Sequence, residues 1–150
     1  MKNQDTANET SATSEERTLS LLCHLSMLLG GILLPIIIWA TQKSKSQFVR
    51  FHSLQAIFFQ IMLGVIIVFG VIIFLILMLA SGFGLGELNN QGNSDMPVFI
   101  MIFMFSFYGF IFLFVFAAIG YSIYIGLKAY KGELVRVIFI GNIIYKKVYG

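Results

Sequence analysis

Among the polar side chains inside or at the edge of the long apolar runs are those of His24, His52, Gln55 and Gln60. His52 and Gln55 are three residues apart, so they are neighbours on one face of a helix, and Gln60 lies near that face further along. Between packed helices, imidazole and carboxamide groups form hydrogen bonds that each stabilise the bundle by about 0.6–2 kcal/mol. We therefore predict that these four residues make polar contacts between helices.

A metal site or a proton relay is the alternative interpretation of these residues. Imidazole and thiolate are ligands for transition metals, and Cys23 lies next to His24. No ligand-spacing motif supports such a site, and none of the seven acidic residues lies within an apolar run. Intramembrane hydrolases, pumps and proton-coupled carriers need ionisable groups at depth. We therefore predict no metal site, no cofactor and no catalytic residue, and a protein that is not an enzyme.

The elements that must position these residues follow from composition. The chain has 150 residues, of which 58% are hydrophobic and 11% charged, whereas a soluble domain is about one quarter charged. Three apolar runs, at 19–40, 54–80 and 98–127, are each long enough to cross a hydrocarbon core of about 30 Å. The expected fold is an all-α integral membrane protein with these three hydrophobic segments. A single membrane domain over 18–150 would follow a disordered polar segment at 1–17.

The first apolar run contains the sequence LLGGILLP, which weakens a continuous helix. Adjacent glycines add backbone freedom, and Pro35 removes a hydrogen-bond donor. Either a kinked helix spans the bilayer, or two half-length helices form a re-entrant hairpin; we favour the kinked span. Ser14 is the expected N-cap of the helix that leads into this run, with Glu15 and Glu16 in its first turn.

Basic residues gather in two blocks, the 41–53 loop and the tail 128–150. Two spans separate the blocks, so the positive-inside rule places both in the cytoplasm and the glycine-rich loop 81–97 outside. The apolar stretch 134–145 is too short to span, so we expect a short interfacial helix there. The basic residues expected to anchor the protein at anionic headgroups are Lys43, Lys45, Arg50, Lys128, Lys131, Arg136, Lys146 and Lys147.

Small residues form a stripe along the third apolar run. At about 100° per residue, Ser106, Gly109, Ala117 and Gly120 fall within a narrow arc, which favours close helix contact. The expected partners are membrane lipid and either a second copy of the chain or another membrane protein, and not nucleic acid. The GFGLG sequence at 82–86 is only superficially like a phosphate loop, because no lysine follows it.

Three stretches together resemble a family of small bacterial membrane proteins of unassigned function. They are ERTLSLLCHLSMLLG at 16–30, FVRFHSLQAIFFQI at 48–61 and KAYKGELVRV at 128–137. That family is related to the inner-envelope component of the chloroplast protein-import translocon. The resemblance implies an all-helical membrane protein with a translocation-related role and no established catalytic residue. The residues that carry it are Arg17, Leu22, His24, Phe48, Val49, His52, Gln55, Lys128, Ala129, Gly132 and Glu133.

Two functional hypotheses follow from these patterns. The first is a non-enzymatic membrane protein that acts as a partner-binding or translocon-like accessory subunit. The second is a small homo-oligomeric channel or transporter, with a polar path along the first two apolar segments. The second hypothesis requires His24, His52, Gln55 and Gln60 to face a common water-filled cavity.

Overall fold

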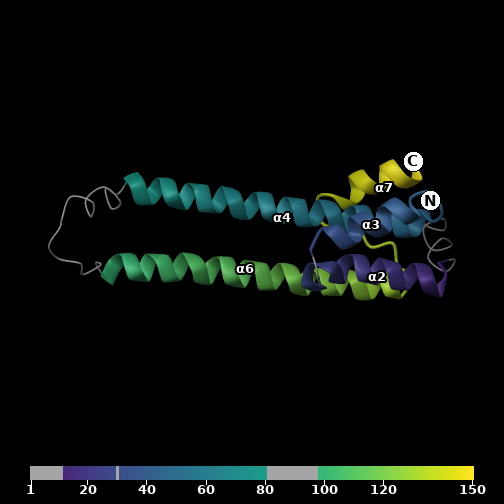
Figure 1. Ribbon diagram of the computed structural model, residues 1–150, viewed down its shortest axis with the longest axis horizontal. Coiled ribbons are helices and arrows are strands. Elements are labelled where there is room, and N and C mark those ends of the chain that lie inside the picture. Colours follow the sequence, from purple (N-terminus) through teal and green to yellow (C-terminus); the bar gives the residue numbers. More distant parts are fainter. Residues whose placement is uncertain (1–11, 30, 81–97) are drawn as a thin grey trace. The chain divides into compact units, whose positions relative to one another are not determined.

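The computed structural model describes residues 12–29, 31–80 and 98–150. Those residues form helices and no strands, so the predicted all-α class is confirmed. The predicted 81–97 loop and most of the polar segment at 1–17 lie outside the described residues. In chain order the helices are α2 (Ser14–Leu29), α3 (Leu33–Gln42), α4 (Gln47–Ala80), α6 (Val98–Tyr130) and α7 (Gly141–Tyr149), as Figure 1 shows.

The chain packs as two compact units rather than around one core. Unit 1 comprises Met1–Met62 and Ala117–Gly150, and unit 2 comprises Leu63–Phe116. Helices α4 and α6 each contribute residues to both units. Unit 1 contains all of α2, α3 and α7, so it holds every short helix of the described chain.

Helix α2 begins with a reciprocal pair of hydrogen bonds. The Thr13 N–H donates to a carboxylate oxygen of Glu16 at 2.7 Å, and the Glu16 N–H donates to the Thr13 hydroxyl at 3.2 Å. This capping box satisfies two N–H groups that a helix start leaves without partners. The N-cap is therefore Thr13 and not Ser14 as predicted, because Glu16 closes the box only with the residue three positions before it.

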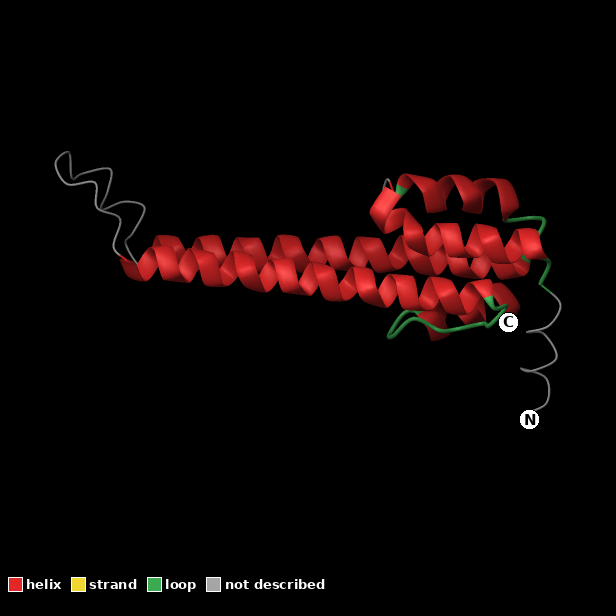
Figure 2. Ribbon diagram, turned by 90° about the horizontal axis from the view of Figure 1, so that it is seen from below, coloured by secondary structure: helices red, strands yellow, loops and turns green. Residues whose placement is uncertain are grey.

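The first apolar run forms a helical hairpin, and the kinked span that we favoured is not observed. The Gly31 N–H donates to the Ser26 carbonyl at 2.7 Å, and Gly31 has a φ of +65°, which glycine adopts without steric cost. Helix α3 folds back so that Leu34 and Ile38 pack against Cys23 of α2. Figure 2 shows the two short helices side by side. Each has too few residues to cross a bilayer alone.

Helix α4 begins at Gln47, seven residues before the run predicted at 54–80. The Val49 N–H donates to the Ser46 hydroxyl at 3.2 Å, which caps the helix start. The predicted 41–53 loop is therefore reduced to a short connection after α3. As a consequence, the sequence QFVRFHSLQA forms the first turns of a helix, and its residues His52, Ser53 and Gln55 enter the interior of unit 1.

The predicted interfacial helix over 134–145 is wrong in its position. Residues 133–137 have no regular secondary structure, and α7 starts only at Gly141. Helix α7 buries Ile144 and Val148 against Phe51 of α4. The helix starts late because the backbone before it forms hydrogen bonds with a side chain of α4, which a helical conformation at those residues would break.

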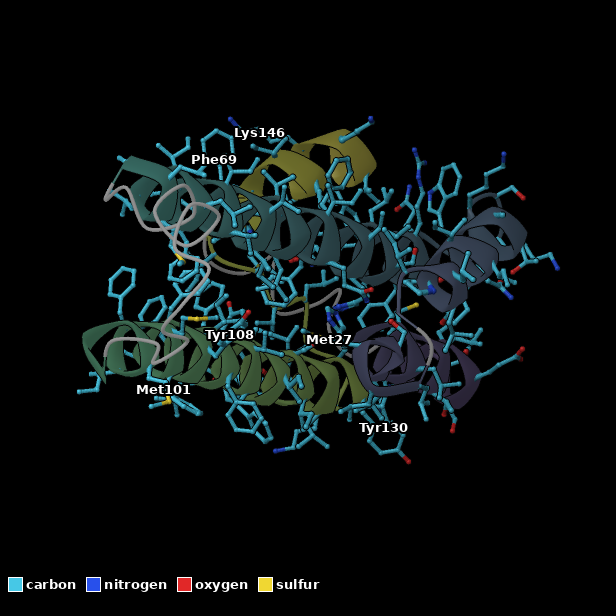
Figure 3. The ribbon with its side chains drawn as sticks, turned by 60° about the vertical axis from the view of Figure 1, so that its left-hand side comes forward. Met27, Phe69, Met101, Tyr108, Tyr130 and Lys146 are labelled. Carbon is cyan, nitrogen blue, oxygen red and sulfur yellow. The ribbon has the colours of Figure 1, made fainter. Side chains whose placement is uncertain are left out.

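Unit 2 consists of the adjoining parts of α4 and α6, and one aromatic stack joins them. Phe74 of α4 stacks on Phe103 at 5.3 Å and on Phe107 at 3.9 Å between ring centroids. Most other large side chains of this unit are exposed, and Figure 3 shows Phe69 and Met101 standing out from their helices. Unit 2 therefore has an apolar exterior.

We expect Gly132→Ala to destabilise unit 1 and Gly132→Asn to restore much of the loss. Gly132 ends α6 with a φ of +88°, and its N–H donates to the Ala129 carbonyl while the Glu133 N–H donates to the Lys128 carbonyl. A β-carbon in this conformation costs about 1–2 kcal/mol, and asparagine tolerates it better than alanine. Thermal unfolding in detergent, followed by circular dichroism, measures the difference. Equal stability of the two variants would contradict this role of Gly132.

Candidate functional site

The candidate site is a set of polar side chains buried in unit 1, which we call the polar core. His24, His52 and Gln55 have almost no exposed surface, although each carries hydrogen-bonding groups. Buried polar groups destabilise a fold unless they find partners, so their contacts determine how the surrounding elements pack. The polar core consists of His24 and Ser26 from α2, His52, Gln55 and Gln60 from α4, and Ser122 from α6.

The two histidines of the sequence contact each other. Nε2 of His24 and Nδ1 of His52 are 3.4 Å apart, and the rings meet edge to face with centroids 5.6 Å apart. One imidazole must donate its N–H and the other must accept, so the hydrogen bond requires that at least one ring is neutral. Phe48 and Phe51 pack edge-on against the His52 ring, with centroid-to-centroid distances of 4.7 Å and 5.2 Å. Two phenylalanine rings therefore flank His52.

Gln55 holds the C-terminal segment against α4 through both ends of its carboxamide. Its Nε2 donates to the Val135 carbonyl at 3.1 Å, and its Oε1 accepts from the Val137 N–H at 2.6 Å. The side chain thus supplies the hydrogen bonds that a neighbouring strand would supply. These contacts join residues that are at least 80 positions apart in the sequence.

Further hydrogen bonds tie α2 to α4 and α6. Gln60 Nε2 donates to the Ser26 hydroxyl at 2.8 Å, and the Ser122 hydroxyl donates to the His24 carbonyl at 2.8 Å. Gly126 of α6 faces the same part of α2, where an added β-carbon would lie 3.1 Å from side-chain atoms of His24 and Leu21. The absence of a side chain at Gly126 therefore lets α6 approach α2 closely.

The structure brings all four predicted polar residues into this core, together with partners that we did not predict. Ser122 and Gly126 form a small-xxx-small pair, which is the sequence signal that would have identified them. The backbone partners of Gln55 have no comparable signal. The two histidines bond to each other, Gln55 bonds to backbone and the half-buried Gln60 bonds to Ser26, so this arrangement gives no support to a polar path for transport.

The other candidate ligand, Cys23, does not join the histidines. Its side chain lies in an apolar cluster with Ile38, Val49 and Ala56. Across residues 12–29, 31–80 and 98–150, no three His, Cys, Asp or Glu side chains come close enough together to hold a metal ion. In the described residues, the side chains of the polar core form hydrogen bonds between elements.

The predicted anchoring residues lie at the surface of unit 1, several of them beside aromatic rings. Lys43 lies 5.4 Å from the Trp39 ring and Lys128 lies 5.4 Å from the Tyr124 ring. Lys128 also pairs with Glu133 at 3.2 Å. Arg136 stacks over Tyr145 at 4.0 Å. Of the remaining predicted anchors, Arg50 is half-buried, and Lys45, Lys131, Lys146 and Lys147 are exposed.

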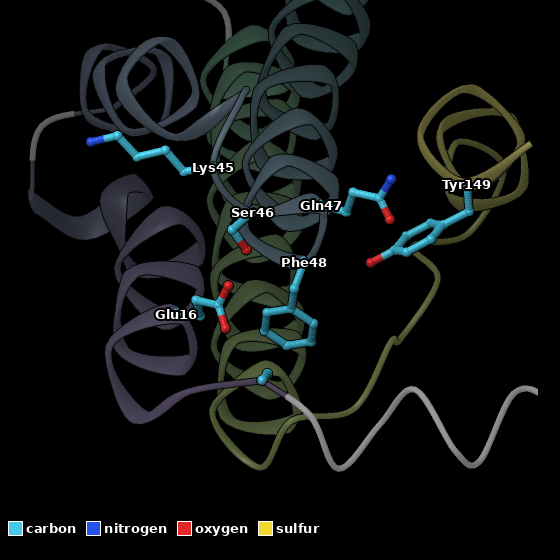
Figure 4. A pocket seen from close by; sticks show the side chains of 7 residues that line it. Glu16, Lys45, Ser46, Gln47, Phe48 and Tyr149 are labelled. Carbon is cyan, nitrogen blue, oxygen red and sulfur yellow. The ribbon is translucent and has the colours of Figure 1, made fainter.

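A small pocket of about 240 Å³ opens beside the start of α4, as Figure 4 shows. The Ser46 hydroxyl is the main cause of a lowered pKa of Glu16, with Thr13 contributing and partial burial opposing it. Burial first, then the charges of Tyr145 and Glu16, raise the pKa of Tyr149 to about 12. The pocket is lined by Ala12, Glu16, Lys45, Ser46, Gln47, Phe48 and Tyr149.

The small stripe of the third apolar run lies apart from the polar core. Ser106, Gly109, Ala117 and Gly120 are all exposed. A β-carbon at Gly109 or Gly120 would meet no other described atom within 4 Å. The stripe therefore makes no close helix contact within the described chain. Close contact with a helix of a partner stays a prediction.

Residues 15–144 match the sequence pattern of the magnetosome magnetite crystal formation protein family (MamF/MmsF). The chain belongs to that family. The matched range contains the whole polar core, α2 except its first residue, and all of α3, α4 and α6. No curated protein and no solved structure matched the chain.

Membership of the MamF/MmsF family corrects the resemblance to relatives of the chloroplast import translocon, which was wrong. The structure explains why those residues misled us. His24, His52 and Gln55 build the polar core, while Gly132 and Glu133 terminate α6. These residues stabilise the fold, so their presence in a sequence does not by itself indicate a translocation activity.

We expect Gln55→Leu to destabilise the protein more than Gln60→Leu does. The first substitution leaves the Val137 N–H and the Val135 carbonyl buried without a partner, at a cost of about 1–3 kcal/mol. After the second, the Ser26 hydroxyl still donates to the Cys23 carbonyl at 2.7 Å, so the loss is smaller. Denaturant unfolding of both variants in the same detergent measures the difference. A larger loss for Gln60→Leu would contradict the central position of Gln55.

Proposed function

We propose that the chain is a non-enzymatic integral membrane protein. It would act as a partner-binding accessory subunit in the process after which its family is named. That process is the formation of magnetite crystals in magnetosomes. The chain crosses the bilayer with α4 and α6, and unit 1 stays at the cytoplasmic face. The observation that carries the proposal is the apolar exterior of these two helices.

Helices α4 and α6 are long enough to cross a bilayer, and most of their apolar side chains are exposed. Gln47–Ala80 and Met101–Tyr130 contain 34 and 30 residues, and only 11% and 6% of their most apolar windows are buried. A core helix of a soluble protein would be mostly buried, and a signal sequence would lie near the N-terminus. Two long helices with exposed apolar side chains are stable in the hydrocarbon core of a bilayer. Their backbone N–H and C=O groups form hydrogen bonds within each helix, so they need no water there.

The charge distribution supports a cytoplasmic unit 1. Lys43 and Lys45 lie in the connection between α3 and α4, and the C-terminal tail carries the second basic block. Short basic segments next to spanning helices stay on the cytoplasmic side. Since α2 and α3 form a hairpin, the proposal also places the N-terminus on that side.

Two observations favour an accessory role over catalysis or transport. The polar core uses its hydrogen-bonding groups to hold unit 1 together, as the contacts of His24, His52 and Gln55 show. The exposed small stripe of α6 offers a surface on which another transmembrane helix can pack closely. We propose that the protein meets its partner, a second copy or another membrane protein, through this stripe.

Membrane insertion is tested by placing charge on α4. We expect the double variant Phe69→Arg with Ile72→Arg to lose resistance to alkaline carbonate extraction, because each central arginine costs about 2.5–3.5 kcal/mol of insertion. Both residues are exposed in the native structure. The matched control, Glu15→Arg with Thr18→Arg on exposed positions of α2, should extract like the native protein. Native protein that stays monodisperse without detergent would contradict the proposal.

The partner surface is tested by photo-crosslinking in native membranes. Leu113 lies on the stripe face of α6, seven residues from both Ser106 and Gly120, and it is exposed. We expect a photoreactive residue at Leu113 to give a defined adduct, and one at Tyr108, exposed on the opposite face, to give none. Adducts of equal yield from both positions, or none from either, would contradict association through the stripe.

A further inference from the structure

Two turns of unit 1 expose several large apolar side chains. The first, which we call the hairpin tip, joins α2 to α3, and there Leu29 and Leu33 keep 68% and 67% of their surface exposed. Exposed aliphatic groups in such a cluster are costly in water and mark an interaction surface. The hairpin tip consists of Leu28, Leu29, Leu33, Ile36 and Ile37.

The second apolar turn precedes α7 and comes from the other end of the sequence. Phe139 is 85% exposed and has a φ of +67°, which is uncommon for a residue other than glycine. Backbone strain of this kind persists where the surrounding structure imposes it, and it concentrates at functional positions. We call Ile138, Phe139 and Ile143, all exposed, the C-terminal turn.

Hydrogen bonds place both turns at the same level along α4. The bond from Gln60 to Ser26 fixes the end of α2, and so the hairpin tip, beside Gln60. The Ile138 N–H donates to the Tyr121 hydroxyl at 3.3 Å, and the Tyr121 ring lies 5.8 Å from that of Phe59. At this level the surface of α4 itself becomes apolar, since Phe58 and Ile61 are exposed.

Aromatic rings with lysines beside them lie at a second level, further from the apolar turns. Trp39 follows Ile38, and Ile38 packs against Cys23. Lys43 lies over the Trp39 ring. Tyr124 is two residues after Ser122, which bonds to the His24 carbonyl, and Lys128 lies over the Tyr124 ring. Tryptophan and tyrosine with lysine are enriched where lipid headgroups meet the acyl chains.

From these levels we infer that unit 1 inserts the hairpin tip and the C-terminal turn into the cytoplasmic leaflet alone, an inference that rests on the proposed membrane location. The occupant of the apolar surface is lipid acyl chain, and the cations beside Trp39 and Tyr124 meet anionic headgroups. Helix α3 has 10 residues, about 15 Å at 1.5 Å per residue, so the hairpin reaches about half of a 30 Å core. The Gly31 N–H of the hairpin turn donates to the Ser26 carbonyl, so this backbone group is satisfied without water.

Trp39 is the only tryptophan, so quenching by brominated lipids reports its depth in the native protein. The protein is reconstituted into phosphatidylcholine–phosphatidylglycerol vesicles brominated near the headgroup or deep in the acyl chain. We expect stronger quenching of Trp39 by the shallow bromines. In a Trp39→Phe background, Leu29→Trp and Phe139→Trp should be quenched at least twofold more by the deep bromines than Trp39 is. Glu15→Trp is the control and should be quenched by neither.

One more tryptophan reporter separates this inference from the proposed function. Phe69→Trp in the Trp39→Phe background lies on α4, and deep quenching there shows that the span is inserted. Deep quenching of Phe69→Trp without quenching of Leu29→Trp and Phe139→Trp overturns the one-leaflet insertion and leaves the proposed function intact. Absence of quenching at all of these positions overturns both.

Sidedness tests the same inference without fluorescence. With Cys23→Ala to remove the native thiol, Ser14→Cys and Ser44→Cys report the two ends of the hairpin, and both positions are exposed. We expect a membrane-impermeant maleimide to label both from the same side of sealed vesicles. Labelling from opposite sides would show that the hairpin crosses the bilayer, and it would overturn the inference.

Discussion

Unit 1 depends on one constraint, which is that a polar group removed from water must find a hydrogen-bond partner. The start of α4 carries His52 and Gln55 into the interior, and each needs partners that its own helix cannot supply. His24 of α2 contacts Nδ1 of His52, and the backbone at 135–137 bonds to both ends of the Gln55 carboxamide. The hairpin and the C-terminal segment are therefore held on α4 by the need to satisfy its polar side chains, while apolar contacts fill the space between them.

The two units share helices α4 and α6 but differ in which side chains they bury and expose. Unit 1 encloses polar groups and turns its charged residues outward, as Lys43 and Lys128 beside their aromatic rings show. Unit 2 has little to enclose beyond the stack of Phe74 with Phe103 and Phe107, and it leaves apolar side chains at its surface. Exposed apolar side chains on long helices suit a lipid environment, which is the environment that we propose for unit 2. The MamF/MmsF family gives that arrangement a biological setting.

Much of the helical content was readable from hydropathy, but the boundaries were not. Periodicity and composition predicted the long apolar runs that became α4 and α6, and the polar residues that became the core. The start of α4 was missed because QFVRFHSLQA is too polar to count as part of an apolar run. The translocon resemblance was misleading because its motif residues cap helices and fill the core, and unrelated activities can share such structural residues.

The sequence alone determined the helical class, the apolar character of the long segments and the placement of basic residues at their ends, because these depend on composition and local periodicity. Only the tertiary structure decided between a hairpin and a kinked span, since that choice rests on the packing of Ile38 against Cys23. It also decided that residues 133–137 are not helical, because their partner is Gln55, about 80 positions away. Local sequence encodes which groups need partners, and the fold selects the partners.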